Sequence, residues 1–119
     1  MKVLIADDSS LSRKLVLKAL PELLTEEVSQ AANGQEVLAA YEAGQAEIIF
    51  LDLTMPVMDG FETLEHLRKS EAEAIIIVVS ADIQPLARQR VMELGAAAFI
   101  KKPITSEAMQ AVLHEIGVV

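Results

Sequence analysis

Short apolar runs alternate along the chain with longer segments in which apolar residues recur at helical spacing. The runs are nearly continuous, which is typical of strands buried on both faces of a parallel sheet. They predict strands near residues 2–6, 28–32, 47–51, 75–79 and 96–100. The second run, Val28-Ser29-Gln30-Ala31-Ala32, is the least apolar and predicts an edge strand.

Capping residues and helical spacing predict a helix after each of these strands. The predicted N-caps are Ser9 or Ser10, Asn33 with Glu36, Asp59 with Glu62, and Asp82 or Gln84 with Pro85 in the first turn. Pro21 is expected to end or kink the first helix, and Gly44 to follow the second. Residues predicted to share a helix face are Leu11, Leu15 and Ala19, then Phe61, Leu64 and Leu67, then Met109, Val112, Leu113 and Ile116.

The alternation of strands and helices predicts an α/β fold of five βα units with right-handed crossovers. No linker, repeat or low-complexity segment interrupts it, so residues 1–119 are expected to form a single domain without an output domain. The hydrophobic fraction of 52% against 24% charged residues indicates a packed globule with a core.

Charge and composition exclude several kinds of partner and chemistry. A formal net charge of −8 opposes non-specific binding to nucleic acid or to an anionic membrane, but it does not oppose Mg²⁺. The absence of cysteine excludes disulfides and thiol catalysis. No apolar run approaches the roughly 20 residues of a bilayer span. We therefore expect a cytoplasmic protein.

Chemically useful side chains follow four of the predicted strands. Asp7 and Asp8 follow the first strand, Asp52 the third, Ser80 the fourth and Lys102 the fifth. In a parallel sheet these carboxyl ends meet at one edge, which is where ligands bind in open α/β folds. Acids, a hydroxyl and a lysine at one edge indicate a magnesium and phosphoryl site.

The chemistry of each group suggests its role. Mg²⁺ prefers oxygen ligands, which Asp8, Asp52 and the backbone carbonyl of Thr54 can supply, with Asp7 binding directly or through water. With the cation offsetting carboxylate repulsion, Asp52 can stay ionised and attack phosphorus. Lys102 and the Ser80 hydroxyl would then bind phosphoryl oxygens.

These residues make the chain resemble the receiver domain of two-component response regulators, of the single-domain chemotaxis type. The resemblance covers the whole chain and depends on Asp7-Asp8, Asp52, Met55-Pro56-Val57-Met58-Asp59-Gly60, Ser80-Ala81 and Lys102-Pro103. It implies a flavodoxin-like (βα)5 three-layer sandwich of strand order 2-1-3-4-5. It also implies that Asp7 and Asp8 hold Mg²⁺, that Asp52 is the phosphoacceptor, and that a cis bond precedes Pro103.

The resemblance further implies partners and a switch. A histidine kinase or histidine phosphotransfer protein is expected to donate the phosphoryl group, and the protein is expected to be a monomer that catalyses only its own phosphorylation and dephosphorylation. Ser80 and Phe99, which stands where many relatives have Tyr, would form the switch. The output face would comprise the fourth helix, fifth strand and fifth helix, with positive charge from Arg88, Arg90 and Lys101.

Two alternatives remain open on the sequence. The first is a Mg²⁺-dependent phosphohydrolase with an Asp nucleophile, as in haloacid-dehalogenase-like enzymes. Those enzymes carry the nucleophile after the first strand with a second Asp two residues on, whereas here Asp52 follows the third strand and Thr54 stands two residues on. The second alternative is a phosphate sink or relay receiver without a downstream target.

Overall fold

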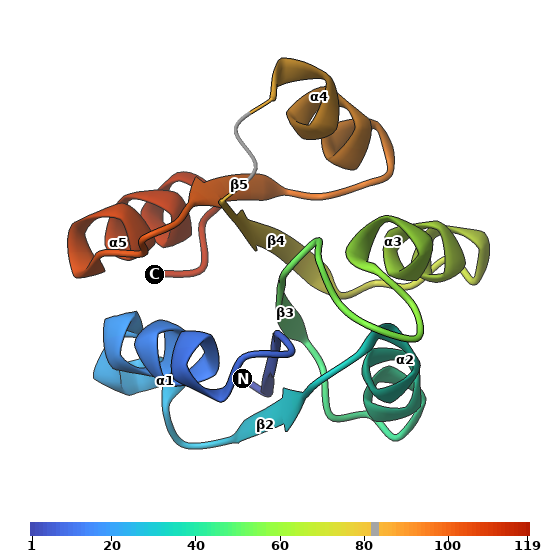
Figure 1. Ribbon diagram of the computed structural model, residues 1–119. Coiled ribbons are helices and arrows are strands. Elements are labelled where there is room, and N and C mark those ends of the chain that lie inside the picture. The colour runs from blue at the N-terminus through green and yellow to red at the C-terminus, as the bar shows by residue number, and fades with distance from the viewer. Residues whose placement is uncertain (82–83) are drawn as a thin grey trace.

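Five parallel strands form one sheet in the order β2-β1-β3-β4-β5 in the computed structural model, which describes residues 1–81 and 84–119 (Figure 1). The strands are β1 (Val3–Ala6), β2 (Val28–Ala31), β3 (Ile48–Leu51), β4 (Ile75–Ser80) and β5 (Ala98–Lys101). The predicted strand order and the edge position of β2 are confirmed. The fifth strand begins later than predicted, at Ala98, because the chain before it is still leaving the preceding helix through Gly95, whose φ is +102°.

Helices cover both faces of this sheet. They are α1 (Ser10–Ala19), α2 (Gly34–Glu42), α3 (Gly60–Lys69), α4 (Pro85–Glu93) and α5 (Ser106–Glu115), with a short 3₁₀ helix at Glu22–Leu24. Figure 1 shows α1 and α5 on one face and α2, α3 and α4 on the other, which makes three layers. No helix in residues 1–81 and 84–119 is long and apolar enough to cross a bilayer.

The helices begin where polar caps were predicted. The side chains of Ser9, Asn33 and Asp59 each accept a hydrogen bond from a backbone N–H in the first turn of the next helix. Such caps satisfy N–H groups that have no partner inside the helix. Gln84 is the N-cap residue of α4, and Asp82, the other predicted cap, lies outside the described residues.

The buried residues divide into two apolar clusters, one on each face of the sheet. In β3, Ile49 and Leu51 belong to the cluster under α2, α3 and α4, and Ile48 and Phe50 to the cluster under α1 and α5. This alternation follows from the two-residue period of a strand. Because both faces are covered, all four residues of β3 are buried, as a near-continuous apolar run predicts.

Of the stripe predicted on the first helix, Ala19 is buried but Leu11 and Leu15 are not. Val16 and Ala19 are buried against the sheet, whereas Leu11 and Leu15 are 65% and 44% exposed. The helix is rotated so that Val16, Ala19 and the following Leu20 fill the core. By contrast, Leu64 and Leu67 of α3 and Met109 and Leu113 of α5 are buried as predicted.

Candidate functional site

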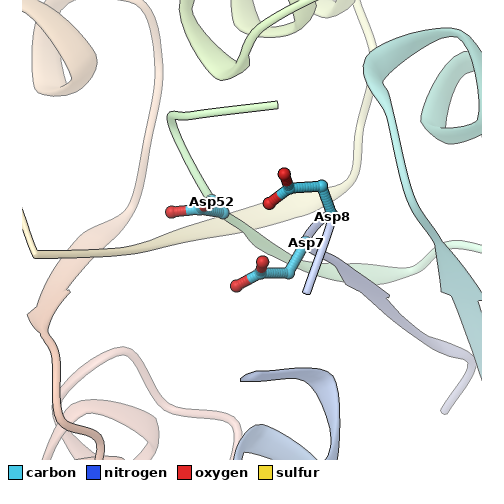
Figure 2. A group of neighbouring side chains, drawn as sticks. All are labelled: Asp7, Asp8 and Asp52. Carbon is cyan, nitrogen blue, oxygen red and sulfur yellow. The ribbon is translucent and has the colours of Figure 1, made fainter. Parts of the chain in front are cut away.

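Three carboxylates from two neighbouring strands lie together at the carboxyl edge of the sheet (Figure 2). Ala6 of β1 pairs with Leu51 of β3, so Asp7, Asp8 and Asp52 emerge side by side. The Asp52 N–H donates to the Ala6 carbonyl oxygen at 2.9 Å, which continues the strand pairing into the site. One oxygen from each of the three carboxylates lies within 4.8 Å of the others.

Burial makes negative charge in this cluster energetically unfavourable. Asp7 and Asp52 are only 3% and 7% exposed, whereas Asp8 is exposed. Burial, together with the charge of Asp7, raises the pKa of Asp52 above its usual value, although Lys102 and a backbone hydrogen bond from Leu53 act in the opposite direction. Asp52 is therefore a carboxylate whose ionised form is poorly solvated and needs positive charge nearby.

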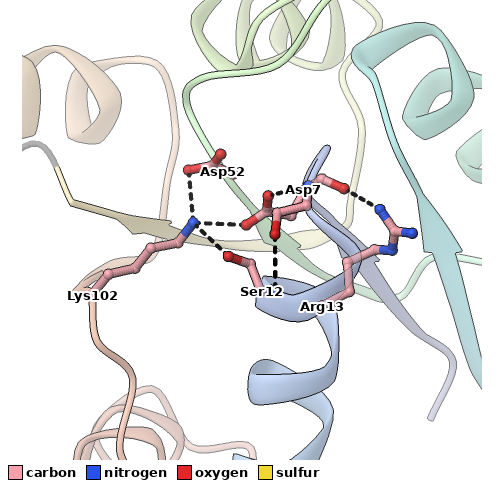
Figure 3. Close-up of polar contacts among 6 residues, drawn as sticks. Asp7, Ser12, Arg13, Asp52 and Lys102 are labelled. Carbon is pink, nitrogen blue, oxygen red and sulfur yellow. Dashed lines mark hydrogen bonds and ion pairs between the residues drawn. The ribbon is translucent and has the colours of Figure 1, made fainter.

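Lys102, which is 95 positions after Asp7 in the sequence, supplies one such charge (Figure 3). Its Nζ donates to Asp7 Oδ2 at 2.7 Å, lies 3.5 Å from Asp52 Oδ1, and lies 3.4 Å from Ser12 Oγ. Burial lowers the pKa of Lys102, but the hydrogen bond to Asp7 and the charges of Asp52 and Asp7 together outweigh it, so the pKa is raised. The lysine therefore stays charged between the two buried carboxylates.

Backbone contacts fix Lys102 beside the end of β4. Its N–H donates to the Ser80 carbonyl oxygen at 2.9 Å, and Ser80 itself is 2% exposed. The Lys102–Pro103 peptide is cis, the isomer that the resemblance implies. Thr54 is exposed in the loop after β3, and the role of its carbonyl stays a prediction.

The loop from β3 to α3 passes very close to the site. A Cβ on Gly60 would lie 2.4 Å from the Asp52 carbonyl oxygen, so only glycine lets α3 begin this close to the strand end. The Met58 carbonyl accepts from the Gly34 N–H at 3.0 Å, which ties the same loop to the start of α2. This close approach explains why glycine follows Asp59.

Two contacts to Asp7 were not predicted from the sequence. The Arg13 Nη1 donates to the Asp7 carbonyl oxygen at 2.6 Å, and its Nε donates to Gln30 Oε1 at 2.8 Å. The Ser9 N–H donates to Asp7 Oδ1 at 2.9 Å. Helical spacing places Arg13 on α1, but no sequence signal shows that its side chain turns back to the strand end.

The donor set fits a hard divalent cation. Asp7, Asp8 and Asp52 offer carboxylate oxygens within reach of one another, and the cluster contains no nitrogen or sulfur ligand among the described residues. Mg²⁺ usually takes one or two carboxylates together with waters and a phosphate. The exposed Asp8 leaves the cluster open to solvent for those remaining ligands.

The family model for the response regulator receiver domain matches residues 3–114. The chain therefore belongs to the family of response regulator receiver domains.

Relatives of several kinds match this chain. Chemotaxis protein CheY of Listeria monocytogenes is 31% identical over 115 residues, 97% of each chain. A protein-glutamate methylesterase/protein-glutamine glutaminase of Halalkalibacterium halodurans is 42% identical over 108 residues, 87% of this chain and 30% of that protein. The chain spans between 5% and 30% of the longer curated relatives that it matches.

The fold agrees with solved receiver structures. A chain in the CheX-CheY-BeF3-Mg²⁺ complex from Borrelia burgdorferi superposes with a TM-score of 0.90 at 27% identity, covering 100% of this chain and 90% of that one.

Proposed function

We propose that this protein is a phosphate-controlled response regulator in a two-component system. Asp52 accepts a phosphoryl group from a histidine kinase or a histidine phosphotransfer protein, and the phosphorylated form binds a downstream partner. The protein acts in the cytoplasm in this proposal, and chemotaxis is one pathway that its CheY relatives suggest. That residues 1–119 form a single receiver domain stays a prediction from the sequence.

The position of Asp52 carries the proposal. The residue is buried at the end of β3, next to Asp7 and Asp8 and 3.5 Å from the ammonium of Lys102. A carboxylate needs such surroundings to remain ionised in a buried place and to approach a dianionic phosphoryl group. None of the groups alone would be informative, but their juxtaposition suits phosphoryl transfer.

Each residue has a defined part in the transfer. Asp7, Asp8, Asp52 and the Thr54 carbonyl would hold Mg²⁺, which when bound neutralises charge on the phosphoryl oxygens. An Asp52 carboxylate oxygen attacks phosphorus, and the bond to the donor nitrogen breaks. The Lys102 ammonium shifts from Asp7 and Asp52 to a phosphoryl oxygen. The Ser80 hydroxyl donates to another of these oxygens.

The output is proposed to pass through α4, β5 and α5. Phe99 in β5 pairs in register with Val78, two residues before Ser80 in β4. A movement of Ser80 toward the phosphoryl group would therefore displace backbone close to the Phe99 ring. Phe99 is half-buried and packs against the apolar cluster under α2, α3 and α4. A change in its burial would alter the face that a partner contacts. Monomeric behaviour before activation is part of the same proposal.

Intact-mass measurement after incubation with acetyl phosphate and Mg²⁺ tests the phosphoacceptor. We expect the wild type to gain one phosphate and Asp52→Asn to gain none, because an amide cannot form the mixed anhydride. Asp59→Asn is the matched control: it changes an acid on the same loop that caps α3, and Asn also caps helices. Labelling of Asp52→Asn at the level of the wild type would refute the assignment.

The phosphohydrolase alternative gains no support from the structure. Asp52 follows β3, the central strand of the sheet, and the residue two positions on is the exposed Thr54. Sustained turnover of small phosphate esters would be needed to revive it. A sink or relay role differs only in the fate of the phosphorylated protein, and capture of partners by the beryllofluoride form, compared with Asp52→Asn, distinguishes it.

A further inference from the structure

A groove with a volume of about 310 Å³ opens beside the phosphoacceptor, between α1 and the turn after β5. Its aliphatic walls come from Leu15, Val16, Val79, Pro103 and Ile104. The volume is at the lower end of the range for pockets that bind small molecules. The groove therefore has the size and the lining for a short aliphatic group.

Its polar lining belongs to the acidic site. Lys102 and Ser12 both line the groove, and the Lys102 Nζ lies 3.4 Å from Ser12 Oγ and 3.5 Å from Asp52 Oδ1. In Figure 3 both side chains converge with Asp52 and Asp7 on one place at the sheet edge. A cationic centre at one end and aliphatic walls beyond it are complementary to a ligand with an anionic head and a short apolar tail.

We propose, on the basis of the proposed function, that this groove binds the acyl chain of an acyl phosphate donor, so that the protein prefers donors with a longer aliphatic chain to acetyl phosphate. The phosphoryl group lies at Asp52 and Lys102, and the acyl chain lies along Leu15 and Ile104. Alkyl phosphate esters have a similar shape but do not phosphorylate Asp52, because an alkoxide is a much poorer leaving group than a carboxylate.

The transfer exchanges one mixed anhydride for another. An ionised oxygen of Asp52 forms a bond to phosphorus, and the bond between phosphorus and the acyl oxygen breaks. The electron pair of the broken bond leaves with that oxygen as a free carboxylate. Charge balances without a proton or a redox partner, because one carboxylate is consumed and one is released.

Chain length provides the measurable signature. A fully buried methylene group is worth up to about fourfold in a rate constant. Because the groove is open on one side, the two additional methylenes of butyryl phosphate are expected to give roughly a three- to tenfold faster phosphorylation than acetyl phosphate. Propionyl phosphate should lie between the two.

The experiment compares second-order rate constants for acetyl, propionyl and butyryl phosphate with Mg²⁺, followed by intact mass. The rate constant for each donor's reaction with hydroxylamine is measured separately, and the phosphorylation rate constant for that donor is divided by it. The butyryl-to-acetyl ratio is then compared in the wild type, Leu15→Ala, Ile104→Ala and Leu11→Ala. Since the ratio is taken within one protein, effects of a substitution on folding or on the shared chemistry cancel.

We expect Leu15→Ala and Ile104→Ala each to lower the ratio at least twofold. Leu11→Ala is the matched control, because Leu11 is an exposed leucine of α1 that does not line the groove, and its ratio should equal that of the wild type. A wild-type ratio of one or less, or a ratio insensitive to both groove variants, would overturn the inference. Failure of the proposed function differs: no donor would label the wild type, or Asp52→Asn would be labelled equally.

Discussion

In the proposed function Asp52 must be ionised although it is buried, and these two requirements oppose each other. Burial and the neighbouring Asp7 raise its pKa, so the folded protein holds the Asp52 proton more tightly than the unfolded chain does. Between the unfolded pKa of about 3.9 and the raised folded value, the folded state therefore binds more protons. Stability must fall as pH rises through that window, because the unfolded state ionises more easily.

We expect Asp52→Asn to remove this pH-dependent loss of stability. The free energy of unfolding at pH 7 without Mg²⁺ should then rise by about 1 kcal/mol, an ordinary size for a single substitution. Lys102 keeps its 2.7 Å contact to Asp7 in this variant, so no new unpaired charge appears. Urea denaturation between pH 3.5 and 8 in EDTA measures the effect, with Asp59→Asn as the control. Identical pH dependence of the wild type and Asp52→Asn would contradict the argument.

Val57 has a backbone conformation that is unfavourable for its β-branched side chain. Its φ is +69°, and the Met58 N–H donates to the Pro56 carbonyl at 2.7 Å, which closes a three-residue γ-turn of the rare, strained form. A β-branched side chain is rare at positive φ. The 69% exposed side chain offers little packing to offset that strain.

Replacing Val57 by Asn should raise the free energy of unfolding by about 1 kcal/mol, because Asn tolerates the left-handed conformation and Val does not. Val57→Ala is the matched control, since it removes the branch but retains a Cβ and should gain less. Urea denaturation at neutral pH compares the three proteins. A loss of stability in Val57→Asn would show that the turn is not strained.

At the scale of elements, α4 is the helix held least by the core. Val91 is its buried residue, and two arginines of α4 contact neighbouring elements. The Arg90 guanidinium lies 4.3 Å from the Phe61 ring centroid and 3.4 Å from a Glu65 carboxylate oxygen. Arg90 is therefore engaged with α3 and is less available to a partner than its charge suggests. Arg88 lies over Phe99, at 5.7 Å from the ring centroid.

We expect beryllofluoride with Mg²⁺ to change amide chemical shifts mainly in α4, β5 and α5, because Phe99 connects the end of β4 to the weakly packed α4. Two-dimensional NMR of the wild type and Phe99→Ala measures this, with Asp52→Asn as the control that cannot bind the analogue productively. In Phe99→Ala the changes in α4 should shrink while those at the site remain. Changes confined to the loops around Asp52 and to α1 would place the output elsewhere.

At the scale of the whole molecule, a chain of net charge −8 concentrates three carboxylates at one edge of its sheet. A cation that binds there stabilises the folded state by mass action, since the unfolded chain does not gather these residues. The gain approaches about 2.7 kcal/mol when the free cation is 100 times its dissociation constant.

Adding Mg²⁺ should therefore raise the thermal unfolding midpoint more than NaCl of equal ionic strength does. The gain should shrink in both Asp7→Asn and Asp8→Asn, and more in Asp8→Asn, because the exposed Asp8 is free of the lysine that binds Asp7. Differential scanning fluorimetry with titrated MgCl₂ compares the three proteins. A smaller gain in Asp7→Asn than in Asp8→Asn would reverse the ranking, and equal effects of both salts would exclude a specific site.

Much of this molecule follows from local patterns along the chain. A buried strand is visible as a short apolar run, and a residue at or just after its end must lie at the sheet edge. Asp7, Asp52, Ser80 and Lys102 could therefore be placed from the pattern alone. Caps such as Asn33 and Asp59 are equally local, because a cap bonds within its own first turn. The strand order came from the family resemblance, since a strand's own sequence does not name its neighbours.

Only the tertiary structure decided how these elements meet. Lys102 binds Asp7 from 95 positions away, and Arg13 turns back to the Asp7 carbonyl; neither contact has a periodic signal. The same holds for the exposure of Leu11 and for the groove along Leu15 and Ile104. Periodicity gives a helix its apolar stripe, but the rotation of that helix on the sheet depends on how all its neighbours pack together.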